Sequence, residues 1–255
     1  MTTDTSAAYL PPVVRGGRPQ DEDRHHAPFP CAVRIAARGD GAAVGRLADQ
    51  ALEHTEESVQ PKVRPGKNLI AHIETRGGVV RTRHGHTICR VAADQQDQVI
   101  GMIHVCPPLS WIDDHPMVMR PALGQAVTEL GMLAVDPDHR GRGIGGSLLA
   151  AVEEDERARG VDVLFTKVAW NNWSSLRWYR RRGFTVAAPG ETFLIYTACG
   201  ETGLIDLNDG HALAYKPMQP GVSIQKHSPA GTSFLYLSSL PADSKNRRLL
   251  LNQPL

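Results

Sequence analysis

The chain has 255 residues, of which 41% are hydrophobic and 22% charged, as in soluble proteins with one large domain or one domain with appendages. Its net charge of +1 creates no global field that favours nucleic acid or an anionic membrane as a partner. No apolar run approaches the roughly 18–20 residues that span a bilayer, and the N-terminus lacks the pattern of a secretory signal.

The first ordered element is expected just after residue 30. Residues 1–30 are rich in proline and polar residues, which predicts a disordered leader that is dispensable for activity. Val33 and Ile35 then alternate as in a short strand. Asp40 is positioned as the N-cap of a helix whose apolar residues repeat from Val44 to Leu52, and a further short helix is expected around Asn68 to Glu74.

A β-hairpin is predicted next, because "TICRVAA" and "QVIGMIHV" flank the turn "DQQD". A hairpin centred between residues 95 and 96 puts Cys89 opposite Met102 rather than Cys106, which argues against a disulfide between these cysteines. The four cysteines of the chain also form no C-x-x-C pair, so we expect reduced thiols and a cytoplasmic location. A proline-containing loop then leads to the strand "AVTELGMLAV".

Helices and strands alternate in the middle of the chain. A helix from about residue 144 has a buried stripe made of Ile144, Leu148, Leu149 and Val152. Its later part, Glu153–Arg159, is expected to face solvent, and Gly160 to end it. "VDVLFTKVA" predicts a buried strand, and "NNWSSLRWYRRRGF" a helix that is closed at Gly183.

The last part of the chain contains further strand patterns. "TFLIYTA" predicts one strand, and "LIDLNDGHALAY" predicts a hairpin that turns at Asn208-Asp209-Gly210. Residues 219–255 form a C-terminal extension in which "SFLYLSSL" either adds one strand or remains a loose tail. The element order predicts an α/β protein with a sheet of mixed direction.

The stretch "HRGRGIGG" contains G-x-G-x-x-G at Gly141, Gly143 and Gly146, and Asp162 follows where a dinucleotide site would hold a ribose. A dinucleotide fingerprint requires its glycines directly after the first strand of a βαβ unit. Here five residues separate them from the strand that ends near Val135, and a hairpin precedes that strand. A different phosphate cradle is therefore favoured.

The same stretch has the chemistry of an anion cradle. Backbone N–H groups at a helix start, together with the positive end of the helix dipole, can bind a pyrophosphate. Glycines remove Cβ atoms and let the backbone approach the oxygens, while Arg140 and Arg142 add positive charge. A glycine-rich turn with surface arginines is the alternative.

Two motifs together resemble the GNAT acetyltransferase superfamily. The first is "LAVDPDHRGRGIGGSLL", in which Arg140, Gly143 and Gly145 match the core R/Q-x-x-G-x-G/A. The second is "NNWSSLRWYRRRGF", which matches N-x-x-S/A-x-x-x-Y-x-x-x-G-F. Its matching residues are Asn172, Ser175, Tyr179, Gly183 and Phe184. The resemblance implies a GNAT fold over residues 31–218, with a mixed central β-sheet, splayed parallel strands and flanking helices.

The resemblance also implies acetyl-CoA as a co-substrate. Its pantetheine arm would lie between the strands that end near Val135 and Val168, bonded by backbone groups of Leu133 and Val135. Asn172 would face the cofactor, cap its helix, or do both. The predicted cofactor-binding residues are Leu133, Ala134, Val135, Arg140, Gly141, Arg142, Gly143, Ile144, Gly145, Gly146, Asn172 and Ser175.

Two side chains are candidates for acid–base catalysis. An alkylammonium has a pKa of about 10.4 and a thiol one of about 8.5, so a base must deprotonate the acceptor and an acid can protonate the departing thiolate. The resemblance puts Tyr179 in the place of the general acid and Glu129 in that of the base, with a backbone N–H near Leu133 for the oxyanion. The alternatives are a core tyrosine and a solvent-facing glutamate.

Other polar groups allow several interpretations. His84, His86 and Cys89 could suggest a metal site, but their spacing favours a plain loop. The triplet Arg180–Arg182 could contact the 3′-phosphate of coenzyme A or favour the helix dipole. Asp113 and Asp114, with Trp111 and His115, could hold a cationic acceptor or form an exposed turn.

The predicted function is transfer of an acetyl group from acetyl-CoA to a primary amine of a small molecule. Acetylation of a protein lysine or N-terminus and a non-catalytic acyl-CoA-binding module are the alternatives. The expected partners are a small-molecule amine and no nucleic acid or membrane, and the resemblance allows a homodimer.

Overall fold

The computed structural model describes residues 30–52, 67–188, 191–196, 202–205, 210–228 and 233–238. The leader expected over residues 1–30 lies outside these ranges, apart from residue 30. None of the helices in the described part of the chain is long and apolar enough to cross a membrane.

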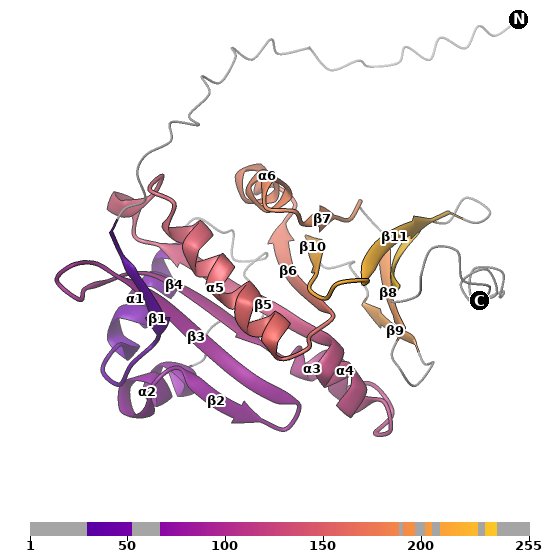
Figure 1. Cartoon of the computed structure of the whole chain (residues 1–255), viewed down its shortest axis with the longest axis horizontal. Coiled ribbons are helices and arrows are strands. Elements are labelled where there is room, and N and C mark those ends of the chain that lie inside the picture. The colour runs from indigo at the N-terminus through magenta and orange to yellow at the C-terminus, as the bar shows by residue number, and fades with distance from the viewer. Residues whose placement is uncertain are drawn as a thin grey trace, which may run out of the picture.

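An eight-stranded mixed sheet forms the centre of the molecule (Figure 1). Its strands are β1 (Ala32–Ile35), β2 (Val79–Thr82), β3 (Gly85–Ala93), β4 (Val99–Cys106), β5 (Val127–Val135), β6 (Val163–Ala169), β7 (Thr185–Val186) and β10 (His211–Pro217). The order is β1-β3-β4-β5-β6-β10-β7, with β2 paired to β3. Only β5 and β6 run parallel to each other; the other neighbours are antiparallel.

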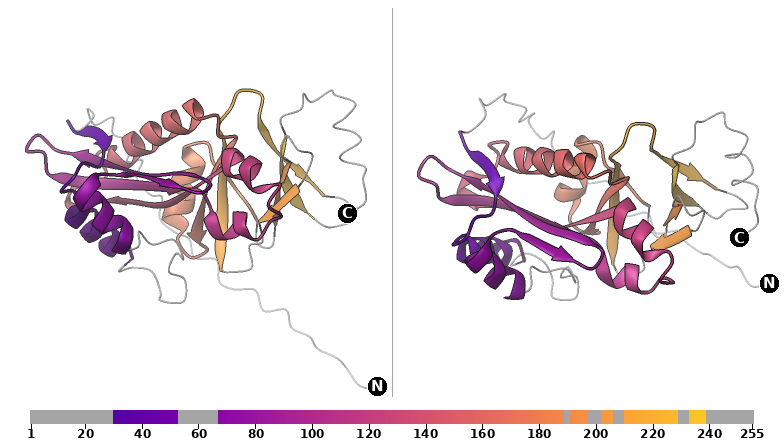
Figure 2. Two further views of the ribbon diagram at one scale, coloured as in Figure 1. Left: turned by 90° about the horizontal axis from the view of Figure 1, so that it is seen from below. Right: turned by 60° about the horizontal axis from the view of Figure 1, so that its bottom comes forward.

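Helices cover both faces of this sheet. The bounds are α1 (Gly41–Leu52), α2 (Lys67–Arg76), α3 (Leu109–Asp113), α4 (Arg120–Ala126), α5 (Ile144–Ala158) and α6 (Trp173–Arg181). Helix α5 lies across one face and α1 and α2 lie on the other, as Figure 2 shows from two sides. The α/β architecture with its mixed sheet confirms the expected fold class.

The apolar periodicity of α5 explains its position. The predicted stripe is buried on the sheet, with Leu148 and Val152 fully enclosed beside Ile103 and Leu130 of β4 and β5. The expected solvated face is wrong in part, because Glu153 and Glu156 are also buried. Glu156 accepts a hydrogen bond from Thr128 Oγ1 at 2.9 Å, so a buried carboxylate here has the partner that burial requires.

The two parallel strands separate after three paired positions. The register runs from Val127–Val163 to Glu129–Phe165 and then stops, although β5 continues to Val135 and β6 to Ala169. We call the point after the Glu129–Phe165 pair the fork. Beyond it, β5 stays paired to β4 and β6 to β10, so two inner strand edges face each other without bonding.

A second sheet lies at one end of the main sheet (Figure 2). Its order is β11-β12-β8-β9, formed by β8 (Thr192–Tyr196), β9 (Thr202–Ile205), β11 (Ser223–His227) and β12 (Phe234–Ser238). The strand expected in "SFLYLSSL" is present as β12. The expected hairpin in "LIDLNDGHALAY" is wrong, because β9 pairs with β8 while β10 joins the main sheet between β6 and β7.

The β3–β4 hairpin has a different register from the one expected. Cys89 lies opposite His104, not Met102. The connection is longer than a two-residue turn, with Asp97 at a φ of 58°, and an irregularity between Ala92 and Ala93 adds one more residue of shift. The conclusion that Cys89 and Cys106 form no disulfide holds, since both cysteines are free.

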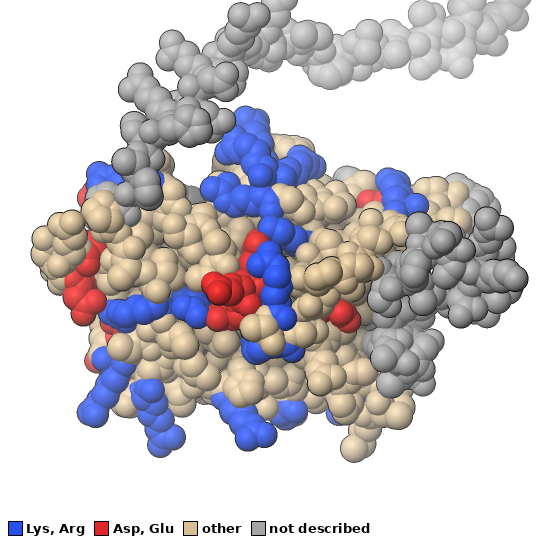
Figure 3. All heavy atoms as spheres, in the orientation of Figure 1, with Lys and Arg blue, Asp and Glu red and all other residues tan. Residues whose placement is uncertain are grey.

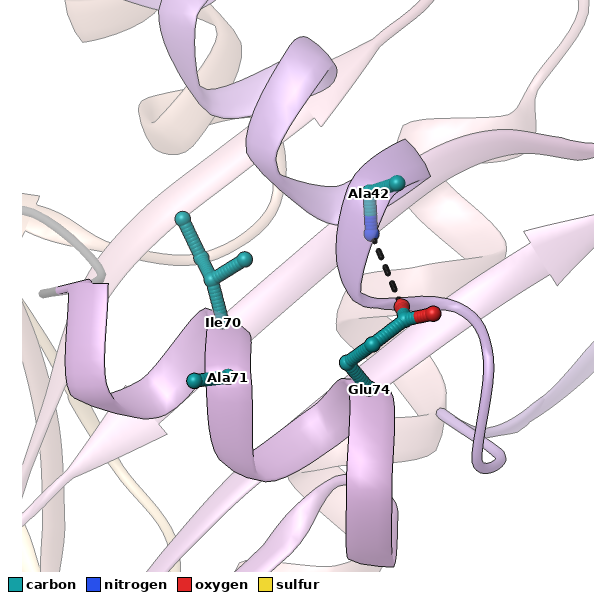
Figure 4. A pocket seen from close by; sticks show the side chains of 4 residues that line it. All are labelled: Ala42, Ile70, Ala71 and Glu74. Atoms are coloured by element: carbon teal, nitrogen blue, oxygen red, sulfur yellow. Dashed lines mark hydrogen bonds between the residues drawn. The ribbon is translucent and has the colours of Figure 1, made fainter.

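Local structure departs from expectation at two further places. The proline-containing loop before β5 holds the short helices α3 and α4. Asp40 accepts a hydrogen bond from Ala37 N–H, while the Ala42 N–H in the first turn of α1 donates to Glu74 Oε2 at 3.3 Å. This bond closes one side of a shallow apolar hollow of about 300 Å³ between α1 and α2 (Figure 4).

Candidate active site

The glycine-rich loop joins β5 to α5 near the fork. A short 3-10 turn (Pro137–His139) follows β5, and Gly141 and Gly143 adopt φ values of 77° and 83°. These left-handed conformations suit glycine because it has no Cβ. They lead into the first turn of α5, whose leading N–H groups have no partner within the helix. We call residues 140–146 the cradle, because a helix start of this kind can bind an anion.

The start of α5 packs closely against the end of β5 and helix α6. A Cβ on Gly145 would lie 3.5 Å from the Trp178 ring and 3.7 Å from Val135. A Cβ on Gly146 would lie 3.3 Å from the Arg182 guanidinium. The two glycines thus let Trp178 and Arg182 approach the first turn of α5, while the side chain of Ile144 is buried in the core beside them.

The Arg182 guanidinium is a cation beside the N-terminal, positive end of helix α5. Its guanidinium stacks on the Trp178 ring at 3.8 Å and donates to Trp178 O at 3.5 Å. No carboxylate pairs with it among the described residues, and burial followed by the charge of Arg181 lowers its pKa. Such a cation beside the N-terminal turn of α5 is stabilised by an anion in the cradle.

Further arginines surround the cradle. Lys and Arg side chains gather over α6 in Figure 3, where Arg180 and Arg181 occupy the last helical turn. Arg140 is exposed, and its Nε donates to Val135 O at 3.0 Å. Arg142 is exposed on the loop between the two left-handed glycines. The loop is thus positively charged on several sides.

The inner edge of β5 presents backbone groups to the gap beyond the fork. Asp136 N–H donates to Ile100 O on β4, so the alternation of an antiparallel ladder turns the polar groups of Leu133 and Val135 away from β4. These are the two residues expected to bond pantetheine. Ala134 pairs with Met102, and its side chain packs in the core under α1, so the structure does not bring Ala134 to the gap.

Tyr179 lies on the α5 side of the sheet, next to the fork. Its side chain is buried between Trp178 and Phe184 in edge-to-face contacts. Burial raises the pKa of the phenol to about 12, against the opposing effect of a hydrogen bond with Thr166. Because Thr166 directly follows the last paired residue of β6, the hydroxyl is held beside the fork in its protonated form.

Glu129 lies at the fork on the opposite face. Thr128 bonds to α5, so strand alternation turns Glu129 toward the face of α1 and α2. Its side chain is buried, and the residue lies opposite Cys106 of β4. Burial raises the pKa of the Cys106 thiol to about 12, and the charge of Glu129 adds to this rise. Glu129 is therefore a buried carboxylate rather than a solvent-facing residue.

Asn172 caps helix α6. Its Oδ1 accepts hydrogen bonds from Ser175 N–H at 3.1 Å and from Ser174 Oγ at 2.9 Å. This is the capping role expected for asparagine at this position, and it accounts for both Asn172 and Ser175 of the second motif. The side chain of Asn172 remains exposed, on the side of α6 where the strands have separated.

Some expected candidates serve the scaffold instead. Asp113 forms ion pairs with Arg83, with His84 at 2.9 Å and with Arg120 at 3.7 Å. This carboxylate is already surrounded by cations, so it anchors α3 to the β2–β3 turn and has little attraction left for a cationic ligand. The His84 Nε2 in this pair belongs to the same anchor, away from Cys89 on the buried strand.

Sequence reasoning missed three residues near the site. Thr166 and Trp178 gave no signal because strand and helix patterns accept threonine and tryptophan without a role. His104 lies on β4 within an apolar strand, where a single polar residue that is 4% exposed could have been noticed as an exception.

Comparison with known sequences agrees with this geometry. The profile described as "Acetyltransferase (GNAT) family" matches residues 50–184, which include the fork, the cradle and both motif helices. This chain belongs to the GNAT acetyltransferase family, whose enzymes use acetyl-CoA as their co-substrate. An amino-acid acetyltransferase of Ectopseudomonas mendocina is 43% identical over 146 residues, which are 57% of this chain and 30% of that protein.

A second relative is matched over more of its own length. The L-methionine sulfoximine/L-methionine sulfone acetyltransferase of Pseudomonas aeruginosa is 33% identical over 107 residues, 42% of this chain and 55% of that protein. The chain therefore matches less than a third of the amino-acid acetyltransferase and about half of this second relative.

Solved structures share the fold. The structure of yncA from Salmonella typhimurium, solved with its cofactor acetyl-CoA, has a TM-score of 0.51 at 19% identity and covers 76% of this chain and 97% of its own. An N-acetyltransferase from Staphylococcus aureus also has a TM-score of 0.51, at 18% identity, and covers 74% of this chain and 99% of its own. At this level of identity the likeness establishes the GNAT fold.

Proposed function

We propose that the protein is an N-acetyltransferase that moves the acetyl group of acetyl-CoA to a primary amine of a small molecule. The observation that carries the proposal is the fork, where β5 and β6 stop pairing between a buried carboxylate on one face and a buried phenol on the other. The glycine cradle at the end of β5 completes the arrangement.

The residues present fit the phosphates and the pantetheine arm of coenzyme A. The cradle and Arg182 supply backbone N–H donors and positive charge for the phosphates. The inner edge of β5 supplies polar groups of Leu133 and the N–H of Val135 for the amides of pantetheine, as an added strand would use them, while Val135 O also accepts from Arg140. The thioester then reaches the fork, since the gap between β5 and β6 closes there.

The chain supplies each proton that the reaction moves. Glu129 accepts a proton from the acceptor ammonium, and the amine nitrogen then bonds to the thioester carbonyl carbon. The Leu133 N–H, which points into the gap, stabilises the oxyanion. The carbon–sulfur bond breaks as the carbonyl reforms, and Tyr179 gives its proton to the departing thiolate. The attached nitrogen loses its second proton, which passes through water to restore the Tyr179 hydroxyl, and Glu129 releases its proton to solvent. The products are the N-acetyl amine and free coenzyme A.

The names of the relatives support a small acceptor. Two of them act, by name, on amino acids or on L-methionine sulfoximine and sulfone. Their acceptor nitrogen is attached to a small polar molecule. An α-amino group is therefore the first acceptor to test.

The experiment is a free-thiol assay with acetyl-CoA and a panel of acceptors: single amino acids, polyamines, lysine peptides and peptides with free N-termini. Thiol release that depends on a small amine, and that falls in Glu129→Gln, supports the proposal. Release with peptides alone would assign protein acetylation instead. Tight coenzyme A binding without release for any amine would indicate an acyl-CoA-binding module and contradict the proposal.

A further inference from the structure

The face of the sheet that carries Glu129 also carries a buried histidine close to the fork. His104 of β4 lies opposite Met132 of β5, and Cys106 lies opposite Glu129. The register shift between these pairs leaves Gly131 as an extra residue in β5. His104 and Glu129 are thus diagonal neighbours on adjacent strands, a spacing that long side chains can bridge.

Strand alternation puts both side chains on the same face. Met102 and Met132 belong to the core beneath α1, and His104 is two residues from Met102 on the same strand. Ile103 and Val105, between and beside them, belong to the opposite core beneath α5. His104 therefore points to the side away from α5, as Glu129 does.

The imidazole of His104 is buried without a partner. It is 4% exposed, and neither ring nitrogen has a hydrogen-bond partner among the described residues. The register neighbours on β3 and β5 are Cys89 and Met132, whose sulfur atoms are weak partners at best. A buried donor and acceptor left unpaired is costly, so such a group in a folded protein requires an explanation.

The imidazole remains neutral under ordinary conditions. Burial lowers its pKa to about 4, so at neutral pH one nitrogen is a donor and the other an acceptor. A neutral acceptor next to a carboxylate suits an ammonium group, which has three N–H donors. A protonated imidazole would instead repel it.

We propose that His104 contacts the acceptor amine, accepting one of its N–H bonds while Glu129 accepts another. The inference rests on the proposed function and adds to it the residue that orients the acceptor nitrogen. Once Glu129 has taken its proton, His104 still holds one N–H of the neutral amine, so the nitrogen can rotate about that bond and turn its lone pair toward the thioester at the fork. The acceptor class is an unhindered primary amine.

The test uses steady-state kinetics with the best amine of the thiol-release panel. His104→Leu removes both ring nitrogens, and His104→Gln keeps a donor and an acceptor. We expect KM for the amine to rise about tenfold to a hundredfold in the Leu variant, the loss typical of a hydrogen bond to a charged group. KM for acetyl-CoA stays within about twofold of wild type, and the Gln variant recovers part of the loss.

Met102→Leu is the matched control, because Met102 lies on the same strand and face and is fully buried. It should leave both KM values unchanged. Equal rises of both KM values in His104→Leu would indicate a packing role and overturn the inference, as would wild-type kinetics. A wild type that acetylates no amine refutes the proposed function and the inference with it. An active wild type with insensitive His104 variants refutes the inference alone.

A second measurement covers the case in which the Leu variant does not fold. In the coenzyme A complex of the wild type, the ring nitrogens of His104 can be assigned in ¹⁵N-histidine spectra by their absence in His104→Gln. Addition of the amine should shift these resonances. Unshifted resonances at saturating amine overturn the proposal.

Discussion

Gly143 and Gly160 flank helix α5 and share one backbone conformation. Their φ values are 83° and 77°, and a Cβ on either would meet nothing within 4 Å. Alanine at each position should therefore cost about 1–2 kcal/mol of stability through strain alone. Only Gly143→Ala should also weaken coenzyme A binding, because relaxing that strain turns the N–H groups of the cradle.

The comparison requires urea unfolding and calorimetric titration of coenzyme A for both variants. Gly160→Ala controls for the strain, since it lies at the far end of the same helix. Equal affinity of the two variants would remove the cradle from the binding site.

Tyr179 offers a second test at the scale of one residue. Its phenol, with a pKa of about 12, carries its proton throughout the working range of pH. Tyr179→Phe keeps the ring between Trp178 and Phe184 and removes only the acid. We expect kcat to fall by about 10²–10⁴, the usual value of general acid catalysis, while affinity for coenzyme A is retained.

Thr166→Val is the control for Tyr179→Phe. It removes the hydrogen-bond partner of the phenol and leaves the phenol itself, so kcat should fall much less than in Tyr179→Phe. A Phe variant with unchanged kcat, measured where chemistry limits turnover, would leave water as the acid.

At the scale of elements, the sequence predicts those parts in which local pattern and final position agree. The stripe of α5, the Asn172 cap and the glycines of the cradle are local features, and the structure bears them out. The β3–β4 register depends on a one-residue irregularity at Ala92, which no side-chain pattern encodes. The pairing of β9 with β8 is a choice of partner, and strand propensity does not specify partners.

The candidate site likewise has one part that the sequence predicts and another that only the folded structure reveals. Its motif residues could be found from spacing, but His104 and Thr166 become part of it only when two strands from different parts of the chain lie beside Glu129 and Tyr179. Burial without a partner is a property of the folded state, so it could not be derived from the strand pattern that contains His104.

Lys216 joins three elements at the back of the cradle. Its Nζ donates to Glu153 Oε1 of α5 at 2.6 Å and to Arg182 O at the end of α6 at 2.8 Å. Lys216→Met should lower the free energy of unfolding by about 1–3 kcal/mol, because the buried Glu153 carboxylate then keeps only Arg157. Chemical denaturation measures the change.

The pair Lys226–Glu191 offers a comparison, since the Lys226 side chain is 57% exposed against 21% for Lys216, and the buried Glu191 carboxylate would keep Ala188 N–H and Ser233 Oγ as donors. Lys226→Met should cost less. An equal or smaller loss in Lys216→Met would show that the contact among β10, α5 and α6 contributes little.

For the whole molecule, His104 predicts sensitivity to acid. Its pKa is about 4 in the folded protein against an ordinary value of 6.5. Below pH 6.5 the unfolded chain takes up a proton that the folded protein refuses until about pH 4, so stability is lost as pH falls through this window. The difference corresponds to about 3 kcal/mol.

Urea unfolding of the wild type and His104→Gln at pH 7, 5.5 and 4.5 isolates this contribution, because the other titrating groups are common to both proteins. The stability of the Gln variant should decline less steeply. An equally steep decline of stability in the wild type and the Gln variant would mean that His104 has the same pKa in the folded and unfolded states.

The second sheet has a consequence for how the chain is made. Strand β8 pairs with a parallel neighbour, β12. The ribosome makes β12 only after β9, β10 and β11, and β10 belongs to the main sheet rather than to this one. Phe193 and Tyr215, stacked and fully enclosed in the finished protein, lack the cover of Leu235 and Leu237 until then. At ribosomal speeds this delay is on the order of seconds, and parallel pairing over such a sequence distance is slow to form. The nascent chain therefore passes through an interval in which these two rings are exposed and can associate with other chains.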